Sequence, residues 1–377
     1  MDEVKILLTI PSFKGKGGVS SYYKSVLPYL LKRCNLDYIE IGSAQRKRFH
    51  FLNDQLKLRE RISENQNIKL VHINPSLDFK SFIRDGLFAW QVKKKNKKLL
   101  VFFRGWNKNF EKKVDKNIML KSFFTHTFGK ADAFIVLATE FKEKLKEWGI
   151  EVPIYGETTV VDDGLIEGFN IQKKIESLLN NDFINFLFLA RLEKEKGVIE
   201  SIKIFEYFKS KGIKGKLTIA GDGPYREEVI HRINKSPYFK DIKYVGFVEG
   251  EKKRKILEKA HIYLFPTYYG EGLPTSVLEA ICFGCFVITT DVGGLKDLWR
   301  KHKWGICVPL DMVVGSKIEG VKKIYDKFLA MRNSVLDIMC ENYKYGIKKF
   351  LASTVSSRID NIYKSLITNK NGNFKQR

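Results

Sequence analysis

Residues 271–297, EGLPTSVLEAICFGCFVITTDVGGLKD, decide the fold of this chain. The turn at 272–276 leads into a short helix, and the apolar strand 286–288 follows. A loop that enters a helix beside a strand presents unpaired backbone N–H groups to an anion. Glu271 and Glu279 flank the turn, and ionised carboxylates accept hydrogen bonds from sugar hydroxyls. The stretch therefore predicts an α/β domain with a site for a compound that carries both phosphate and sugar.

Apolar runs alternate with amphipathic segments along the rest of the chain, which predicts mainly parallel sheets. We expect strands at 4–10, 38–41, 70–73, 99–103, 133–137, 186–189, 217–220, 243–245 and 262–265. We expect helices at 19–31, 139–148, 198–211, 225–233, 251–259 and 316–330, and one long helical stretch at 335–366. Residues 151–182 are less regular and rich in turn residues, so we place a domain junction there.

Length and composition describe a globular protein. A chain of 377 residues can form two domains with separate cores, and 44% hydrophobic with 29% charged residues is typical of soluble proteins. No run of about 18 apolar residues occurs, so we expect no membrane-spanning helix. The apolar run 6–8 is too short for a signal peptide, so a cytoplasmic location is expected.

The five cysteines are too few and too scattered for a disulfide framework. Cys282 and Cys285 form one Cys-x-x-Cys pair, but a zinc site would need a second pair. We therefore expect both to serve packing, and the sequence shows no motif for a metal site.

Positive charge is concentrated at the two ends of the chain. Residues 1–150 carry a net charge of +15, residues 151–300 carry 0 and residues 301–377 carry +9. A protein that acts mainly on nucleic acid would not need a neutral middle third. The distribution suggests one positive surface that faces anionic lipid headgroups or a lipid-diphosphate acceptor, and simple solubility is the alternative.

Six short motifs occur in an order that resembles one known family. They are Gly17-Gly18-Val19, Arg191–Gly197 (RLEKEKG), Ala220–Pro224 (AGDGP), Val245–Val248 (VGFV), Glu271–Glu279 and Asp291–Gly294 (DVGG). Together they resemble the retaining nucleotide-sugar glycosyltransferases of family four, which have the two-domain GT-B fold. Each motif is weak alone, but all six in order at domain-compatible spacing are a strong signal.

The resemblance assigns the donor site to the second half of the chain. It implies that Glu279 holds the ribose hydroxyls, that Glu271 lies near the transferred sugar, and that the turn between them binds the diphosphate. The further donor-binding residues that it implies are Gly272, Leu273, Pro274, Thr275, Ser276, Gly221 and Phe247. Two alternatives remain open, because Ser276 and Glu279 also have the spacing of a capping box and the turn can be an ordinary helix cap.

The resemblance also places Arg191 and Lys196 on the diphosphate. Two cations there would stabilise the departing nucleoside diphosphate without a metal. The implied catalytic residues are therefore Glu271, Arg191 and Lys196. The alternative for the two cations is a solvated charge pair within a Glu-Lys-Glu-Lys run.

Two further positions belong to the cleft by resemblance. Gly17 and Gly18 would allow a close approach of backbone to substrate, although a simple tight turn is equally compatible with the pair. Arg104 stands where the family often carries a histidine, and an arginine cannot act as a base near neutral pH. It could bind a donor sugar carboxylate or an acceptor phosphate, and a structural salt bridge is the alternative.

The implied fold is α/β of the GT-B type, with two Rossmann-like domains whose parallel sheets face a central cleft. Residues 1–165 would bind the acceptor, residues 166–349 the nucleotide sugar, and residues 350–377 would pack back on the first domain. We expect metal-independent transfer of a hexose, with retention, from a UDP- or GDP-linked donor to a hydroxyl of a lipid-linked glycan. Beyond this nucleotide-sugar co-substrate we expect no cofactor and no nucleic-acid partner. The expected setting is a bacterial surface polysaccharide, capsule or lipopolysaccharide, assembled at the inner face of the membrane.

Two other classes of protein fit the sequence less well. A Rossmann oxidoreductase is disfavoured because residues 15–18 lack the Gly-x-Gly-x-x-Gly spacing. A non-catalytic basic protein that binds nucleotide or membrane is disfavoured by the neutral middle third and the intact cleft motifs.

Overall fold

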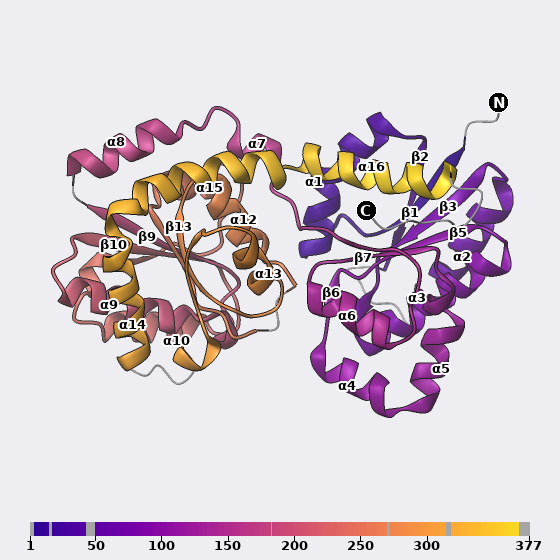
Figure 1. Cartoon of the computed structure of the whole chain (residues 1–377), viewed down its shortest axis with the longest axis horizontal. Coiled ribbons are helices and arrows are strands. Elements are labelled where there is room, and N and C mark those ends of the chain that lie inside the picture. The colour runs from indigo at the N-terminus through magenta and orange to yellow at the C-terminus, as the bar shows by residue number, and fades with distance from the viewer. Residues whose placement is uncertain are drawn as a thin grey trace. The chain divides into compact units, whose positions relative to one another are not determined.

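The computed structural model describes residues 4–14, 17–42, 50–181, 183–269, 272–313 and 318–368. The chain forms two compact units, which Figure 1 shows with their helices and strands labelled. Unit 1 comprises residues 1–160 and 352–377, and unit 2 comprises residues 161–351. The division falls after Val160, five residues before the expected junction, and unit 1 resumes at Ala352 instead of residue 350.

Unit 1 is built on a six-stranded parallel sheet in the order β2-β1-β3-β5-β7-β8. Its strands are β1 (Lys5–Pro11), β2 (Leu36–Ile41), β3 (Ile68–Ile73), β5 (Lys98–Phe102), β7 (Ala133–Val136) and β8 (Ile154–Gly156). Its helices are α1 (Gly18–Arg33), α2 (His50–Glu64), α3 (Phe79–Lys94), α4 (Lys108–Lys116), α5 (Ile118–His126), α6 (Thr139–Glu147) and α16 (Ala352–Thr368). A short pair, β4 (Ser76–Leu77) with β6 (Gly105–Trp106), and the 3-10 helix η1 (Phe128–Lys130) complete the unit.

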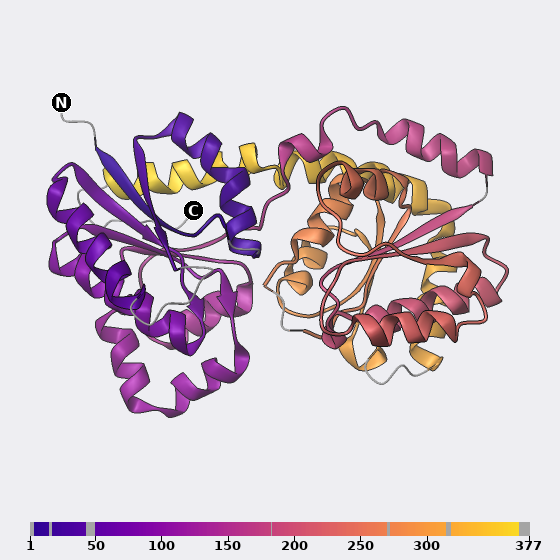
Figure 2. The ribbon, with the colours of Figure 1, turned by 180° about the vertical axis from the view of Figure 1, so that it is seen from behind.

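Alternation along the strands of unit 1 produces two hydrophobic cores. Leu7 of β1 packs with Phe82 and Phe88 of α3, whereas Leu8 packs on the opposite face with α1 and α16. Successive strand side chains point to opposite faces, so a strand that is apolar throughout needs helices on both sides. Helix α16 lies alongside α1 in both views of the ribbon, which places the end of the described chain in unit 1 (Figures 1 and 2).

Unit 2 repeats this plan with the strand order β11-β10-β9-β12-β13-β14. Its strands are β9 (Ile184–Leu189), β10 (Gly215–Ala220), β11 (Ile242–Tyr244), β12 (Ile262–Phe265), β13 (Phe286–Thr290) and β14 (Gly305–Val308). Its helices are α7 (Asp163–Ile166), α8 (Ile171–Asn181), α9 (Val198–Ser210), α10 (Arg226–Asn234), α11 (Gly250–Lys259), α12 (Thr275–Cys282), α13 (Gly294–Lys301), α14 (Ile318–Ala330) and α15 (Val335–Lys349). Four 3-10 turns, η2 (Lys194–Lys196), η3 (Phe239–Asp241), η4 (Leu310–Met312) and η5 (Arg332–Ser334), lie between them.

Two expectations about the elements were wrong. The irregular segment 151–182 contains the helix α8, whose Ile171 and Ile175 are buried against the core of unit 2. The long stretch 335–366 is two helices, because the chain leaves the helical path at Phe350 and Leu351. There the Val161 amide donates to the Phe350 carbonyl oxygen (2.8 Å), and Val161 pairs with Leu351. This backbone pairing takes the place of the next helical turn.

Candidate active site

The predicted donor residues gather at the carboxyl edge of the sheet of unit 2. The chain adds β10 and β11 on one side of β9 and then places β12 on the other, so β9 and β12 flank a topological switch point. In open α/β sheets ligands bind outside the carboxyl ends of the strands at such a point. The loops that leave these two strands carry Arg191, Lys196 and the start of α12.

Two glycines allow the loops that follow β9 and β10 to pack closely against each other. A Cβ atom on Gly221 would overlap the carbonyl oxygen of Ala190, and one on Gly223 would overlap that of Leu192. The Leu192 amide donates to the Asp222 carbonyl oxygen (3.0 Å), while the Asp222 carboxylate accepts from the Gly223 amide (2.9 Å). Asp222 thus tightens its own turn, as expected from its residue type. The packing of the two loops accounts for Gly221, and its role in donor binding stays a prediction.

Arg191 and Lys196 have different surroundings. Arg191 is 68% exposed and lies 3.1 Å from the Glu193 carboxylate. Lys196 ends the short helix η2 and is half-buried, with its ammonium 4.2 Å from the centre of the Tyr269 ring. The Tyr269 loop is fixed on η2, because the amides of Tyr268 and Tyr269 both donate to the Glu195 carbonyl oxygen. The ring therefore holds the Lys196 ammonium beside the ends of β9 and β12, in a cation–π contact.

Helix α12 begins at Thr275 with its N-terminus beside the end of β9. The buried Tyr263 hydroxyl lies 2.8 Å from both the Leu189 carbonyl oxygen and the Ser276 Oγ, which ties the first turn of α12 to that strand. No side chain of the described residues caps the helix. Its first N–H groups and its dipole are thus suited to an anion.

Glu279 is 6% exposed and makes an ion pair that sequence reasoning missed. Lys253 of α11 places its ammonium 2.6 Å from Glu279 Oε1. The capping-box alternative was wrong, because the Ser276 hydroxyl binds Tyr263 and the Glu279 carboxylate binds Lys253. Lys253 lies 26 residues before Glu279 and belongs to no motif, so only the folded position of α11 reveals the pair.

Two other predicted donor-site residues are Glu271 and Phe247. Glu271 lies outside the described residues, so its expected place near the transferred sugar stays a prediction. Phe247 is exposed and follows Gly246, whose φ is 72°. The neighbouring Gly272, Leu273 and Pro274 form the approach to α12, where Leu273 is buried.

The cleft residues predicted in the first half lie at the carboxyl edge of the sheet of unit 1. Here β1 and β3 flank the switch point, and Gly17 and Gly18 form the start of α1, the first helix after β1. Gly17 has an extended backbone, and a Cβ atom on either glycine would meet nothing within 4 Å. The fold of unit 1 therefore gives no steric reason for either glycine.

Arg104 follows β5 at the same edge and is 8% exposed. Its guanidinium carbon lies 3.7 Å from the centre of the Tyr22 ring and 4.4 Å from that of Phe102. The salt-bridge alternative was wrong for the described residues, in which no carboxylate lies within 4.0 Å of the guanidinium. Arg104 is thus a buried cation held on two aromatic rings.

Cys282, Cys285 and His126 occupy ordinary packing or surface positions among the described residues. Cys282 and Cys285 are buried and free, and burial raises the pKa of both thiols. The His126 ring is exposed and contacts the Ser122 carbonyl oxygen of its own helix at 2.8 Å. The described residues contain no grouping of three or more His, Cys, Asp or Glu side chains placed to hold a metal ion.

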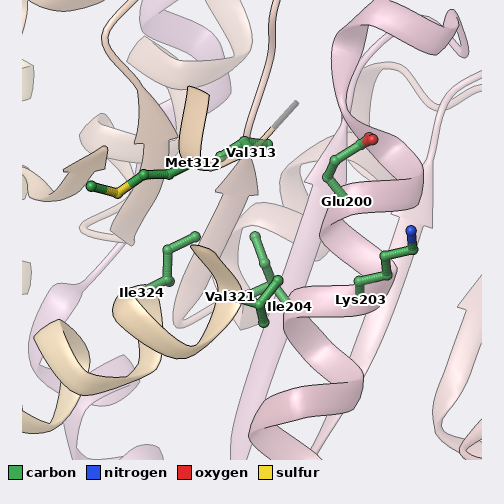
Figure 3. Close-up of a pocket in the computed structure, with 7 residues that line it drawn as sticks. All are labelled: Glu200, Lys203, Ile204, Met312, Val313, Val321 and Ile324. Carbon is green, nitrogen blue, oxygen red and sulfur yellow. The ribbon is translucent and has the colours of Figure 1, made fainter. Parts of the chain in front are cut away.

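A small pocket in unit 2 lies elsewhere, between α9, α14 and η4 (Figure 3). Ile204, Val321 and Ile324 lie between the two helices, with Glu200 and Lys203 on α9 (Figure 3). The space open to the centre of a water molecule is about 10 Å³, which corresponds to about one water. It is too small for a nucleotide and contains none of the predicted site residues.

Comparison with known proteins finds a family similarity in the second half of the chain. Residues 170–327 match the family Glycosyl transferases group 1. This segment lies within unit 2 and contains the loop after β9, the Gly221 turn and helix α12. The geometry at the β9–β12 switch point thus coincides with the part of the chain that carries the family signal.

Among curated proteins, the chain is similar to the gpi3 subunit of the phosphatidylinositol N-acetylglucosaminyltransferase of Schizosaccharomyces pombe, with 25% identity over 52% of this chain and 41% of the relative. It is also similar to the putative teichuronic acid biosynthesis glycosyltransferase TuaC of Bacillus subtilis, with 32% identity over 31% of this chain and 27% of the relative. The matched part spans less than half the length of either relative.

Solved structures match nearly the whole chain. A glycosyltransferase from Rickettsia africae has a TM-score of 0.69 at 18% identity, covering 98% of this chain and 100% of its own. Anabaena Alr3699/HepE in complex with UDP has a TM-score of 0.68 at 14% identity, covering 96% and 100%. At this level of identity the likeness concerns the fold. The chain is α/β with the GT-B fold, as expected, and together the comparisons support a glycosyltransferase.

None of the helices in the described ranges combines the length and apolar composition needed to cross a lipid bilayer.

Proposed function

We propose that this protein transfers a hexose from a nucleoside-diphosphate sugar to a hydroxyl of a glycan acceptor, with retention of configuration. The observation that carries the proposal is the N-terminus of α12, which no described side chain caps, beside the buried carboxylate of Glu279 at the β9–β12 switch point. One end of this site suits a diphosphate and the other suits a ribose. The match of this segment to group 1 glycosyl transferases supports the same assignment.

The donor would bind through backbone and charge. The first N–H groups of α12, from Thr275 and Ser276, would receive the diphosphate, and Gly272 would let it approach closely. Glu279 would accept hydrogen bonds from the two ribose hydroxyls. The Lys253 ammonium lies 2.6 Å from Glu279 Oε1 and holds the carboxylate in place, and a carboxylate can accept hydrogen bonds from two hydroxyls. Exposed Phe247 would shape the edge of the nucleobase pocket.

The chemical step would depend on the two cations after β9. Breaking the bond between the sugar and the diphosphate leaves new negative charge on the phosphate. Arg191 and Lys196 would stabilise that charge, which makes a metal unnecessary for this task. In a front-face reaction the departing phosphate oxygen takes the proton of the attacking hydroxyl, so no protein nucleophile forms a bond to the sugar. Glu271 would support the positive charge that develops at the anomeric carbon.

UDP is the preferred candidate for the nucleotide, with GDP as the alternative. Alr3699/HepE, which shares the fold, has been solved with UDP and with UDP-glucose. The acceptor would bind in unit 1. The similarity to a teichuronic acid biosynthesis glycosyltransferase supports a surface polysaccharide as the product, assembled on a lipid-linked glycan.

We expect the replacement Glu279→Gln to weaken UDP binding by about 10- to 100-fold, because hydrogen bonds to a charged group contribute about 1.5–3 kcal/mol. Glutamine keeps the size of the side chain but loses the charge. The measurement is nucleotide release from a panel of UDP-, GDP- and ADP-sugars in EDTA, with calorimetric titration of the free nucleotides. Selective EDTA-resistant release by the wild type would establish the donor. Lack of binding by every nucleotide would contradict the proposed function.

A surface of unit 1 supports contact with an anionic membrane. Unit 1 carries 35 Lys+Arg against 18 Asp+Glu, a net charge of +17, whereas unit 2 carries +7. At the corner between α4 and α5, Ile118 is 84% and Met119 is 75% exposed. The two helices that meet at this corner patch carry four exposed lysines, which are Lys112, Lys113, Lys116 and Lys121. Apolar side chains within a basic surface suit the interface of an anionic bilayer.

The corner patch can be tested with lipid vesicles. We expect the double replacement Ile118→Ser and Met119→Ser to reduce cosedimentation with phosphatidylglycerol vesicles by about tenfold, because two apolar side chains no longer enter the interface. Ile318→Ser is the matched control, since Ile318 is 79% exposed on unit 2. Equal binding of the double variant and the wild type would rule out this patch as the contact.

The rival classes have less support. A nicotinamide-dependent oxidoreductase would need a dinucleotide site after β1, and the loop there lacks the glycine spacing of such a site. A non-catalytic basic protein would leave the cations beside the α12 N-terminus without a task. The donor panel separates both from a transferase, because neither would release nucleotide from a sugar donor.

A further inference from the structure

Arg104 is a buried cation whose charge the described residues do not neutralise. The residue is 8% exposed, and its guanidinium lies against the rings of Tyr22 and Phe102. Within the described part of the chain, Nε and Nη1 are shielded from solvent and have no hydrogen-bond partner. Burial lowers the pKa of Arg104, with Tyr22 acting in the opposite direction.

The carboxylate whose charge acts on Tyr22, that of Glu157, already forms an ion pair with Arg358. The Glu157 carboxylate, directly after β8, accepts hydrogen bonds from two nitrogens of Arg358 on α16, at 2.8–3.1 Å. Its charge acts on Tyr22, where it is opposed by Arg104 and Arg358. Unit 1 thus contains a matched Arg–Glu pair, and beside the same tyrosine a second arginine without a carboxylate.

Three further polar atoms of unit 1 have no hydrogen-bond partner among the described residues either. The Tyr22 hydroxyl, His72 Nε2 and Thr9 Oγ1 are buried and have no hydrogen-bond partner in the described structure. Burial raises the pKa of Tyr22 to about 12, so its hydroxyl remains a neutral donor. Burial and the charge of Arg104 lower the pKa of His72 to about 3, so its ring remains neutral. Arg104 is therefore the one positive charge among these four groups.

These groups come from β1, α1, β3 and the end of β5, and the neighbouring strands β1 and β3 flank the switch point of this sheet. An unpaired buried charge is costly to fold, and cation–π contacts recover only part of that cost. Such a group is retained where a ligand completes it. A guanidinium and a phenol present N–H and O–H donors together, which is the chemistry that binds a carboxylate or a phosphate group.

We propose that Arg104, with Tyr22, forms an oxyanion subsite in unit 1 for a carboxylate or phosphate group of a substrate. The identity of the substrate rests on the proposed function. The existence of an anion site at Arg104 does not. The anionic group would supply the charge that Arg104 lacks and would orient the substrate at the edge of the sheet. A neutral sugar would leave the guanidinium unpaired, so the subsite selects charged substrates.

The test compares the full-length wild type with Arg104→Met and Arg104→Lys. Calorimetric titration with inorganic phosphate, and separately with glucuronate, is carried out in saturating UDP so that the site of unit 2 is occupied. We expect Arg104→Met to lose at least tenfold in affinity for the anion, and Arg104→Lys to retain part of it because lysine keeps the charge without the planar fork. Arg232→Met is the matched control, since Arg232 is paired with Glu206 in unit 2. It should bind the anion as the wild type does.

A separate readout distinguishes a binding role from a structural one. We expect Arg104→Met to unfold without ligand at a temperature equal to or above that of the wild type, because the replacement removes an uncompensated charge. Anion binding that is unchanged in Arg104→Met, or absent from the wild type, would overturn the proposal. UDP affinity should be the same in all variants, so failure of the donor site would appear independently.

Measurements of turnover show whether the donor or the acceptor supplies the anionic group. If Arg104→Met lowers nucleotide release from UDP-glucuronate but not from UDP-glucose, the subsite holds a donor carboxylate. If the replacement lowers both rates in the presence of a phosphorylated acceptor, the subsite holds the acceptor. Either result supports the oxyanion subsite. Equal turnover of the variant and the wild type with both donors would contradict it.

Discussion

Replacing Lys196 with alanine is expected to lower kcat for sugar transfer by about 10²- to 10³-fold, the effect typical of losing one group that stabilises a departing oxyanion. The Lys196 ammonium lies 4.2 Å from the centre of the Tyr269 ring, at the carboxyl ends of β9 and β12. The charge on the diphosphate grows as the bond to the sugar breaks, so the cation matters most in the transition state. The loss should therefore appear more strongly in kcat than in the donor KM.

Lys194→Ala supplies the control for this experiment. Lys194 belongs to the same 3-10 helix η2 but is exposed, so its removal should leave kcat nearly unchanged. Lys196→Arg should recover part of the rate, because it restores the charge with a different shape. A similar loss in the Lys194 and Lys196 variants would mean that η2 contributes general positive charge and that Lys196 has no specific position on the leaving group.

Much of the fold was predictable because parallel strands are covered on both faces. Their apolar runs are continuous, and those at 70–73, 133–137 and 262–265 correspond to β3, β7 and β12. Helix α8 was missed although Ile171, Ile175 and Leu178 recur at helical spacing. The turn residues at 162–164 shortly before it interrupt the apolar pattern and weaken its signal. The break between α15 and α16 has no local signal, because a distant pairing with Val161 causes it.

The same distinction holds for the candidate site: features that depend on neighbouring residues in the sequence were predictable, and contacts between distant residues were not. The glycine turns and the start of α12 follow from short motifs, so they were predictable. The partners of the charged residues were not. Lys253 approaches Glu279 because α11 packs near α12, and Arg104 is buried because α1 and β5 bring Tyr22 and Phe102 to it. Sequence alone left a salt bridge and an anion site as alternatives for Arg104. Its surroundings among the described residues exclude the salt bridge, and the anion site stays a proposal.

We expect Gly221→Ala to destabilise unit 2 by about 3–5 kcal/mol, through backbone strain and steric overlap together. The backbone φ of Gly221 is 140°, which side-chain-bearing residues rarely adopt. The Gly221 amide also donates to the Gly246 carbonyl oxygen (2.8 Å), so the turn cannot move without loss of that bond. For a domain of this size the change corresponds to a fall in Tm of about 6–20 °C, which differential scanning calorimetry can measure.

Gly212→Ala is the control that separates overlap from strain. Gly212 also has a positive φ, 85°, but a Cβ atom there would meet nothing within 4 Å. Its replacement should cost only about 1–2 kcal/mol, the penalty of a left-handed backbone. At Gly221 the added atom would meet the Ala190 carbonyl oxygen in the loop that leads to Arg191 and Lys196. The stability of that loop and the position of the two proposed catalytic cations are therefore coupled. Gly221→Ala should reduce UDP-sugar turnover even below its Tm, whereas equal effects of the two variants on Tm would show that the loops are not in close contact.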